Sequence, residues 1–433
     1  MTNKMTNTFM PSFKTREQLG EHQLKRLKWT VDHAYAHSPF YKKKFDENGV
    51  NGNNIASLDD IRRLPFTTAH DLKDGYPFPL LSVPESDIVR IHASSGTTGK
   101  KKILCYTQKD INDWVHLFAR CYEMAGISNM DRVQIAVGYG VWTAGVGFQL
   151  GCEKLGAMAL PIGPGNIDMQ CQFLVDLQPT VMCCTASMAL LMAEEINNRG
   201  LKDKIALKKL IFGSERSGDA MRSRIKDLMG VDDIFDITGM TELYGPGTGI
   251  DCHKHEGIHY WADYYILEIL NPETLEPVLP GETGEMVVTT LSKEAAPLIR
   301  YRTRDITRMI EEPCSCGNIM PMHDRILGRS DDMFIFRAVN IYPGQIDEIL
   351  SKTPDISCEY QIVLDRDEGG KDQMTIRVEC HEGAQPANYK EIAQNVCRAV
   401  KKNIMVSCNV EPVDYCGLPR SERKSTRFFD NRE

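Results

Sequence analysis

Residues 91–102 join a serine- and threonine-rich turn, two glycines and three lysines in one short run. Residues 87–91 alternate in polarity before the turn, and a second short apolar run follows at 103–106, which is typical of two β-strands. Glycine lets the backbone approach a ligand closely. Amide and hydroxyl donors, together with lysine charge, bind anionic oxygens. The segment therefore predicts a loop between two strands that holds a polyphosphate.

The spacing of this segment differs from that of the common nucleotide-binding P-loop. A P-loop has the pattern G-x-x-x-x-G-K-[ST], whereas only two residues separate Gly96 from Gly99, and no serine or threonine follows the lysines. A flexible serine–glycine turn with solvated lysines therefore remains an alternative for the segment considered alone. The rest of the chain has to decide between the two interpretations.

Between residues 109 and 229, apolar strand-like runs alternate with stretches of helical periodicity. This alternation predicts a parallel sheet that is covered by helices on both faces. Ligands of such sheets bind at the carboxyl ends of the strands. Glycine-containing turns follow strand-like runs at 138–140, 213–214 and 239. We therefore expect these three turns to line one crevice.

The sequence pattern changes twice towards the C-terminus. From about residue 264 to residue 328, alternating runs between turn signals predict a β-rich subdomain. A short polar break at 329–332 follows, and short strand and helix patterns over residues 333–433 predict a small α+β unit. The expected fold class is α/β, with a large N-terminal domain over residues 1–328, a hinge at 329–332 and a small, mobile C-terminal domain.

The composition argues against two classes of function. The net charge of −8 disfavours a nucleic-acid-binding protein held by phosphate contacts. The apolar stretch at 135–152 is interrupted by glycines and is too short to span a membrane comfortably, and no signal peptide is expected. The 14 cysteines are scattered along the chain, which favours reduced thiols in a cytoplasmic enzyme over a disulfide framework.

Four separated segments share their patterns with one enzyme superfamily. In chain order they are S-S-G-T-T-G-K at 94–100, T-G-M-T-E at 238–242, Y-R-T-R-D at 301–305 and G-R-S-D-D at 328–332. Together they resemble the motifs of the adenylate-forming enzymes, which include the acyl-CoA synthetases. Thr238 stands where the second motif usually has tyrosine.

Five further features narrow the resemblance to the phenylacetate–CoA ligase family. They are L-P at 64–65 with Y-P-F at 76–78, Y-G-P-G at 244–247, C-S-C-G at 314–317, D-R-I-L-G-R-S-D-D at 324–332 and L-P-R-S-E-R-K at 418–424. The resemblance covers the chain from about residue 10 onwards. It implies an aryl-acid–CoA ligase in which ATP and a carboxylate give an acyl-adenylate and pyrophosphate. The thiol of coenzyme A then displaces AMP.

The same resemblance implies a nucleotide site. The loop at 94–100 would hold the β- and γ-phosphates, with Lys100 in the motif and Lys101 and Lys102 as solvated neighbours. Asp305 would accept from the ribose hydroxyls, and Arg329 would support the ribose and α-phosphate, although a surface salt bridge is the alternative for Arg329. The implied cofactor-binding set is Ser94, Ser95, Gly96, Thr97, Thr98, Gly99, Lys100, Gly213, Ser214, Glu215, Asp236, Ile237, Thr238, Gly239, Met240, Asp305, Arg325 and Arg329.

Lys424, Glu242 and Thr241 form the catalytic set that the resemblance implies. Lys424 would bridge the substrate carboxylate and the α-phosphate as a point charge, unless it is a solvated lysine of a basic tail. Arg423 stands before it, where the family usually has glycine. Glu242 would bind Mg²⁺, a hard cation that prefers carboxylate oxygens. Asp331 would be the hinge about which the small domain rotates for the thioester step.

The acyl pocket should combine flat aromatic walls with glycines. The implied substrate-binding residues are Tyr139, Gly140, Trp142, Gly145, Tyr244, Gly245 and Pro246. The rings of Tyr139 and Trp142 suit an aryl group. Ordinary packing of aromatic side chains in the core is the alternative, and the residues themselves do not name the acid.

A separate hypothesis concerns a structural zinc site. Cys314 and Cys316 lie in a turn-like sequence, and Cys252 and His259 lie about sixty residues before them. These four side chains would satisfy tetrahedral Zn²⁺ with no position left for a substrate. Free cysteines are the alternative, because a C-x-C pair is a looser signal than paired C-x-x-C motifs.

Two rival functions remain compatible with the sequence. The chain could adenylate an acid and load a different thiol, such as that of a carrier protein, or it could be a non-catalytic nucleotide-binding relative. Glu242, Asp305 and Lys424 argue against lost chemistry. The family resemblance also implies a homodimer.

Overall fold

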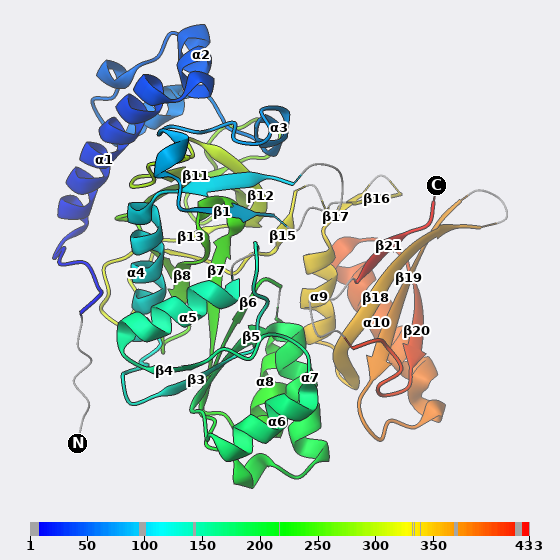
Figure 1. The fold of residues 1–433 in the computed structure, drawn as a ribbon. Helices are drawn as coiled ribbons and strands as arrows, with labels where there is room; N and C mark the ends of the chain where they lie inside the picture. The colour runs from blue at the N-terminus through cyan, green and yellow to red at the C-terminus, as the bar shows by residue number, and fades with distance from the viewer. Residues whose placement is uncertain are drawn as a thin grey trace.

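The computed structural model describes residues 8–94, 101–141, 144–215, 217–330, 332, 334–337, 339–367, 371–420 and 427–432. The predictions for residues 95–100, Trp142, Asp331 and Lys424 therefore lie outside the described residues. Figure 1 shows a large N-terminal region beside a smaller C-terminal region in orange and red. The architecture confirms the predicted α/β fold class, with β-rich parts in the large region and an α+β C-terminal region.

Three helices begin the chain and lie at the top of Figure 1. They are α1 (Arg16–His37), α2 (Pro39–Asn48) and α3 (Ala69–Asp74). Ser38 separates α1 from α2, because its hydroxyl accepts from the backbone N–H of Tyr41 and Pro39 takes the first helical position. Thr68 begins α3 in a reciprocal capping box with Asp71.

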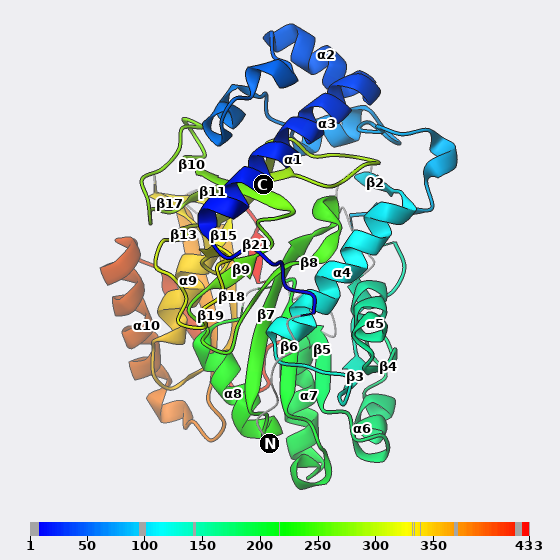
Figure 2. The same cartoon turned by 90° about the vertical axis from the view of Figure 1, so that its left-hand side faces the viewer.

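A nine-stranded sheet forms the centre of the N-terminal region (Figure 2), in the order β13-β14-β9-β8-β7-β6-β5-β3-β4. From β4 to β7 the pairs are parallel, as predicted, but from β7 to β13 they are antiparallel. The strands are β3 (Arg132–Ile135), β4 (Met158–Leu160), β5 (Val181–Thr185), β6 (Lys209–Gly213), β7 (Asp233–Met240), β8 (Gly245–Asp251), β9 (Ile258–Tyr260), β13 (Met309–Ile310) and β14 (Met322–His323).

Helices cover both faces of the parallel half, as the sequence predicts. They are α4 (Gln108–Met124), α5 (Ala144–Leu155), α6 (Ile167–Asp176), α7 (Ala186–Asn198) and α8 (Asp219–Met229). Alternate residues of β5 enter opposite cores: Val181 packs in the core with α4 and α5, and Met182 in the core with α6, α7 and α8. Burial on both faces explains why β5 is apolar up to its last residue, Thr185.

The hairpin predicted around the serine–glycine segment is present. Strands β1 (Arg90–Ala93) and β2 (Ile103–Tyr106) pair antiparallel. At the base of the connecting loop, the backbone N–H of Ser94 donates to the Lys102 carbonyl at 3.0 Å, and the Lys102 N–H donates to the Ser94 hydroxyl at 3.2 Å. These two bonds fix where the loop leaves the hairpin.

A four-stranded antiparallel sheet forms a second β-rich part, in the order β10-β11-β12-β15. Its strands are β10 (Tyr265–Leu270), β11 (Gly284–Thr290), β12 (Tyr301–Thr307) and β15 (Gly328–Arg329). Asp305 of β12 is directly opposite Arg329 of β15. The pairing of these strands therefore brings together two of the motifs recognised in the sequence.

The C-terminal region has its own hydrophobic core. A hairpin precedes helix α9, and helix α10 lies in the same region as a sheet of order β20-β19-β18-β21. The elements are β16 (Phe334–Phe336), β17 (Val339–Ile341), α9 (Pro343–Ser351), β18 (Ile356–Arg366), β19 (Asp372–Cys380), α10 (Tyr389–Ile404), β20 (Asn409–Val413) and β21 (Phe428–Asp430). Within the described part of the chain, no helix is long and apolar enough to cross a membrane.

Candidate active site

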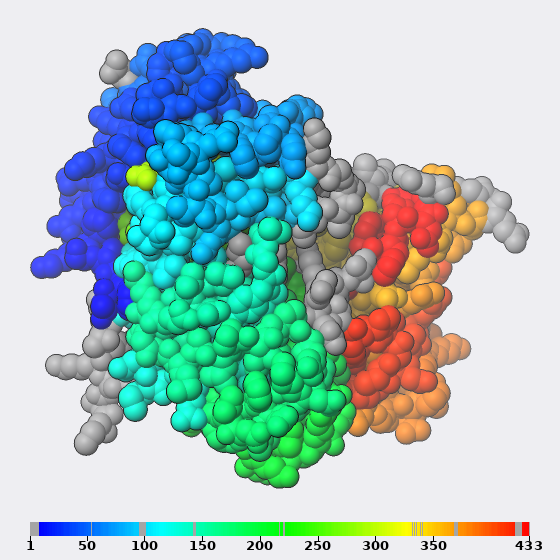
Figure 3. Space-filling view, viewed as in Figure 1, coloured from blue at the N-terminus to red at the C-terminus, as the bar shows by residue number. Residues whose placement is uncertain are grey.

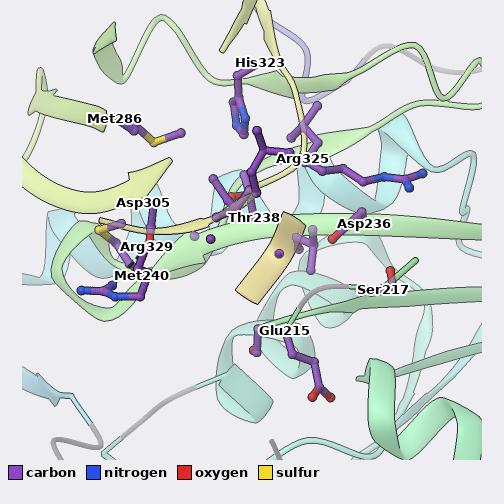
Figure 4. Close-up of a pocket in the computed structure, with 18 of the residues that line it drawn as sticks. Glu215, Ser217, Asp236, Thr238, Met240, Met286, Asp305, His323, Arg325 and Arg329 are labelled. Carbon is purple, nitrogen blue, oxygen red and sulfur yellow. Dashed lines mark hydrogen bonds and ion pairs between the residues drawn. The ribbon is translucent and has the colours of Figure 1, made fainter. Parts of the chain in front are cut away.

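A pocket of about 340 Å³ lies where the N-terminal region meets the C-terminal region (Figure 4). It is lined by the turn that follows β6 and by the carboxyl half of β7, residues 236–240, together with residues of β12, β15, α9 and β18 among others. Ten of the predicted nucleotide-binding residues line it: Ser214, Glu215, Asp236, Ile237, Thr238, Gly239, Met240, Asp305, Arg325 and Arg329. The structure thus gathers three distant sequence motifs around one cavity.

Two glycines allow the strands to meet at this pocket. A Cβ atom at Gly213 would clash with the carbonyl oxygen of Ile237, so glycine lets β6 and β7 lie close together. Gly239 has φ of +151°, and a Cβ there would clash with the backbone of Gly245 at the start of β8. The turns at 213–214 and 239 line the pocket as expected, but the turn at 138–140 does not, so the expectation of one crevice for all three was wrong.

Asp305 and Arg329 form an ion pair on the wall of the pocket. The Arg329 Nη1 atom donates to Asp305 Oδ1 at 3.2 Å, across the β12–β15 pair. Figure 4 shows both side chains at the same end of the cavity. Arg329 thus lines the pocket beside the predicted ribose acceptor, in a salt bridge that leaves its side chain 38% exposed.

The opposite end of the pocket contains two carboxylates that are held by neighbouring elements. Glu215 accepts from the backbone N–H and the hydroxyl of Ser187, at 2.7 and 2.8 Å, at the start of α7. Asp236 Oδ2 accepts from Arg222 at 2.9 Å. Burial raises the pKa of Asp236 to about 6, and the charge of Asp251 adds to this shift whereas Arg222 opposes it. Asp236 therefore titrates in an accessible pH range.

Glu242 lies outside this pocket, under the β1–β2 hairpin. Its carboxylate is buried, forms an ion pair with Lys102 and accepts from the Tyr301 hydroxyl at 2.9 Å. Burial alone raises the pKa of Glu242, but the charge and hydrogen bond of Lys102, a backbone hydrogen bond and the Tyr301 hydroxyl together outweigh burial and hold the pKa below its usual value. The expectation that Lys102 is merely solvated was therefore wrong. Thr241 is buried beside Glu242, and its carbonyl accepts from Tyr106.

A buried lysine that the sequence did not reveal supports the same turn. Lys293 is fully buried and donates to the Glu242 carbonyl at 2.9 Å and to the Tyr106 hydroxyl at 3.3 Å. Burial lowers the pKa of Lys293 to about 8. Arg222 and Ser187 also escaped prediction. These residues carry no motif, because only the tertiary fold brings them to the site.

The predicted acyl-pocket residues divide between surface and core. Tyr139 is 38% exposed, and a Cβ at Gly145 would lie 2.6 Å from its ring, so glycine is needed for this packing. The Tyr244 ring, in contrast, is buried between Tyr106 and Tyr265, at centroid distances of 5.8 and 6.4 Å. This packing matches the alternative in which Tyr244 is an aromatic residue of the core. The described acyl-pocket residues that do not line the nucleotide pocket are Tyr139, Gly140, Gly145, Tyr244, Gly245 and Pro246.

The four proposed zinc ligands come together in the structure. The ligand atoms of Cys252, His259, Cys314 and Cys316 all lie within 4.8 Å of one another. Cys252 Sγ is 3.6 Å from Cys314 Sγ, and Cys316 Sγ is 3.5 Å from His259 Nε2. The other ring nitrogen of His259 contacts the Met320 carbonyl at 2.9 Å, an outer hydrogen bond that orients a metal-binding imidazole. The donor set fits tetrahedral zinc.

Comparisons with known proteins identify the family of the chain. The model of the family described as AMP-binding enzyme matches residues 14–292, and that of the AMP-binding enzyme C-terminal domain matches residues 338–432. The phenylacetate-coenzyme A ligase of Escherichia coli (strain K12) is 39% identical over 99% of both chains. The enzyme of the same name from Pseudomonas putida is 38% identical over 96% of this chain and 95% of its own.

Solved structures of a 2-hydroxyisobutyryl-CoA ligase in two states match the chain to different degrees. Its postadenylation state, in complex with 2-HIB-AMP, matches with a TM-score of 0.88 at 27% identity, over 97% of this chain and 91% of that one. Its thioesterification state, with 2-HIB-AMP and CoA, matches with a TM-score of only 0.70 at 28% identity, over 98% and 91%. This structure is thus more similar overall to the postadenylation state. The chain belongs to the AMP-binding enzymes and, among them, to the phenylacetate–coenzyme A ligase family.

Proposed function

We propose that this protein is an ATP-dependent aryl-acid–CoA ligase that forms an acyl-adenylate and then an acyl-CoA thioester, releasing pyrophosphate and AMP. The observation that carries the proposal is the pocket in which Asp305 and Arg329 face the Ser214–Glu215 turn and the β7 strand. The proposal is supported by the similarity of this chain to a phenylacetate-coenzyme A ligase, which is 39% identical along nearly its whole length. Phenylacetate or a related aryl acid is the proposed substrate.

In the first half-reaction the protein has to bring two anions together. We place the adenine between Ser214–Glu215 and β7, the ribose on Asp305, and the phosphates towards the β1–β2 hairpin. Lys424 then bridges the substrate carboxylate and the α-phosphate. Fixed cations and amide donors stabilise the charge that develops, because they need no reorganisation during the reaction.

Glu242 is our proposed ligand for Mg²⁺. Tyr301 and Lys102 both contact its Oε1 atom, and the Glu242 carboxylate would hold the hard cation through an oxygen atom. When bound, Mg²⁺ supplies positive charge to the phosphates. Lys102, Tyr301 and the buried Lys293 keep the Glu242 side chain and its turn in place for that ion.

The second half-reaction requires a different arrangement of the two regions. The related 2-hydroxyisobutyryl-CoA ligase has been solved in a postadenylation and a thioesterification state. We propose that this protein also makes the adenylate in the present arrangement, and that its C-terminal region then rotates about residues 329–332 to admit CoA. Asp331 is the proposed pivot.

The titration of Asp236 gives a prediction for nucleoside binding. If the ionised carboxylate accepts from the adenine amino group, protonation below the pKa of about 6 removes that acceptor. Adenosine affinity is therefore expected to fall about tenfold per pH unit below pH 6 and to stay level above it. Calorimetric titration with adenosine, which has no phosphate that titrates there, measures this profile. The Asp236→Asn variant should bind more weakly with a flat profile, and a flat wild-type profile would contradict the role.

We also propose that Cys252, His259, Cys314 and Cys316 hold one structural zinc ion. Burial lowers the pKa of His259, which favours the neutral imidazole that binds metals. The four ligands come from the end of β8, from β9 and from the loop before β14, so the ion would tie these segments together. A zinc site of this kind contributes directly to folding free energy.

Loss of the zinc ion should therefore lower the thermal stability of the protein, and not its activity alone. The purified protein is expected to contain zinc in a one-to-one ratio with the chain by elemental analysis. Cys314→Ser should lose the metal and lower Tm by about 5–10 °C. Cys397→Ser is the matched control, because Cys397 is a free thiol outside the cluster. Equal zinc content in both variants would refute the assignment.

Two further parts of the proposal concern the cellular location and the oligomeric state of the protein. We propose a cytoplasmic enzyme, because all 14 cysteines are free thiols and the zinc site needs reduced sulfur. We propose a homodimer from the family resemblance, and light scattering of the purified protein tests it directly.

A panel of aryl and aliphatic acids tests the proposed activity. AMP formation should require ATP, an aryl acid and CoA together, and the aryl acids should exceed aliphatic acids of similar size. AMP formation that never yields an acyl-CoA product would refute the ligase.

A further inference from the structure

A partly buried cluster of polar and charged side chains, outside the lining of the nucleotide pocket, joins the two regions. Glu194 of α7 and Arg224 of α8 belong to the N-terminal region, whereas Tyr415, Arg420 and Glu379 belong to the C-terminal region. In Figures 1 and 3 the red segment that follows β20 lies against the green helices of the N-terminal region. Charge, rather than apolar packing, therefore dominates this contact.

Arg420 is shared by two carboxylates, one from each region. It donates to Glu379 from Nη1 and Nη2 at 2.8 Å each, and to Glu194 from Nε and Nη2 at 3.1 and 3.2 Å. Glu379 is fully buried and Glu194 is 9% exposed. Bidentate pairs of this kind are among the stronger and more directional polar contacts.

Tyr415 completes the contact on the N-terminal side. Its hydroxyl donates to Glu194 at 3.1 Å and accepts from Arg224, and the Arg224 guanidinium lies 4.9 Å from its ring centre. Glu194 therefore has two partners from the C-terminal region and one, Arg224 at 3.5 Å, from its own region. Any rotation that separates the regions would take Tyr415 and Arg420 away from Glu194.

The two ion pairs of Arg420 respond differently to a rotation of the C-terminal region. The Arg420–Glu379 pair lies within the C-terminal region, so it survives a rotation of that region. The Arg420–Glu194 pair exists only while α7 faces Tyr415 and Arg420. The interaction with Glu194 thus stabilises one domain arrangement and not the other. A contact shifts the equilibrium between two arrangements only by the difference between its free energies in them.

We propose that Glu194, with Arg420 and Tyr415, forms an interdomain latch that favours the adenylate-forming arrangement and has to open before CoA can react. This inference rests on the proposed two-step function. Glu194 is a positioning residue in this account, because it acts through the placement of the C-terminal region and does not contact the nucleotide pocket. Loss of the latch should therefore slow adenylate formation but should not slow thioester formation.

Glu194→Gln is the informative variant. It removes the charge of Glu194 but leaves Arg420 paired with Glu379, whereas loss of Arg420 would leave a fully buried carboxylate unpaired and risk the fold. Glu195→Gln is the matched control, because Glu195 is the next residue of α7 and pairs within its own region with Arg199 at 2.9 Å. Both variants carry the same chemical change on the same helix.

The two half-reactions are measured separately on the full-length proteins. Acid-dependent ATP–pyrophosphate exchange reports adenylation, and the reaction of a synthetic acyl-adenylate with CoA reports thioester formation. For Glu194→Gln we expect exchange to fall about tenfold, as for the loss of hydrogen bonds to charged groups, while thioester formation stays unchanged or rises. Tyr415→Phe should show the same pattern with a smaller change. Glu195→Gln should match the wild type in both.

The outcomes separate the latch from the proposed function. An equal fall in both half-reactions would show a merely structural role and overturn the latch, as would exchange equal to that of Glu195→Gln. Failure of the wild-type protein to catalyse exchange with any acid would instead refute the proposed function, and the latch with it.

Discussion

Replacement of Lys424 by alanine is expected to lower acid-dependent ATP–pyrophosphate exchange by about 10²- to 10³-fold, the usual cost of losing one group aimed at developing charge. ATP binding should stay close to that of the wild type, because Asp305 and the β6–β7 residues remain. Lys424 lies outside the described residues. Arg427, three residues further along, lines the pocket and is held by Glu359 at 3.2 Å. The described chain therefore resumes at the pocket with Arg427.

The matched control for this prediction is Lys401→Ala, which removes an exposed lysine from the last turn of α10. Calorimetric titration with ATP separates binding from chemistry. Wild-type exchange in the Lys424→Ala variant would assign Lys424 to a solvated tail and would remove it from the mechanism.

Replacement of Asp305 by alanine should mainly weaken nucleotide binding. Two ribose hydroxyls would lose a charged acceptor, each worth about 1.5 kcal/mol or more, so KM for ATP should rise by about 10²-fold. Arg329 would also lose its partner in the pocket. KM for the acid should change little, because none of the described acyl-pocket residues lines this cavity.

Asp372→Asn provides the comparison for Asp305, because Asp372 also pairs with an arginine, Arg432 at 2.7 Å, but on a strand outside the pocket. Steady-state kinetics at saturating acid and CoA give KM for ATP in each variant. A similar KM in the Asp305 variant and in the wild type would place the ribose elsewhere.

The sequence predicted those elements whose signals are local. Alternation around the serine–glycine segment gave the β1–β2 hairpin, and alternating strand and helix patterns gave the parallel half of the central sheet. The four cysteine and histidine residues were also brought together as predicted. For the hairpin and the parallel strands, a short local pattern determines the structure.

The sequence could not predict contacts that depend on the tertiary fold. The sheet extends from β7 into antiparallel β8 through a short 3-10 turn, Thr241–Leu243, which has no distinctive period. Strand β12 was hidden within a motif interpreted for its chemistry. Lys102 looked like its neighbours, yet only its side chain meets the buried Glu242 among the described residues of that loop. Tyr244 looked like a pocket wall but packs inward against Tyr106.

The central claim is that one protein forms an adenylate and then passes its acyl group to CoA. The most direct test incubates the enzyme with ATP and phenylacetate without CoA, measures enzyme-bound acyl-adenylate by mass spectrometry, and then adds CoA. We expect adenylate in a stoichiometric amount and its conversion into phenylacetyl-CoA and AMP. If neither phenylacetate nor related aryl acids give an adenylate, a non-catalytic nucleotide-binding protein would be indicated. An adenylate that CoA does not consume would show that another thiol is the acceptor, and either result would contradict the claim.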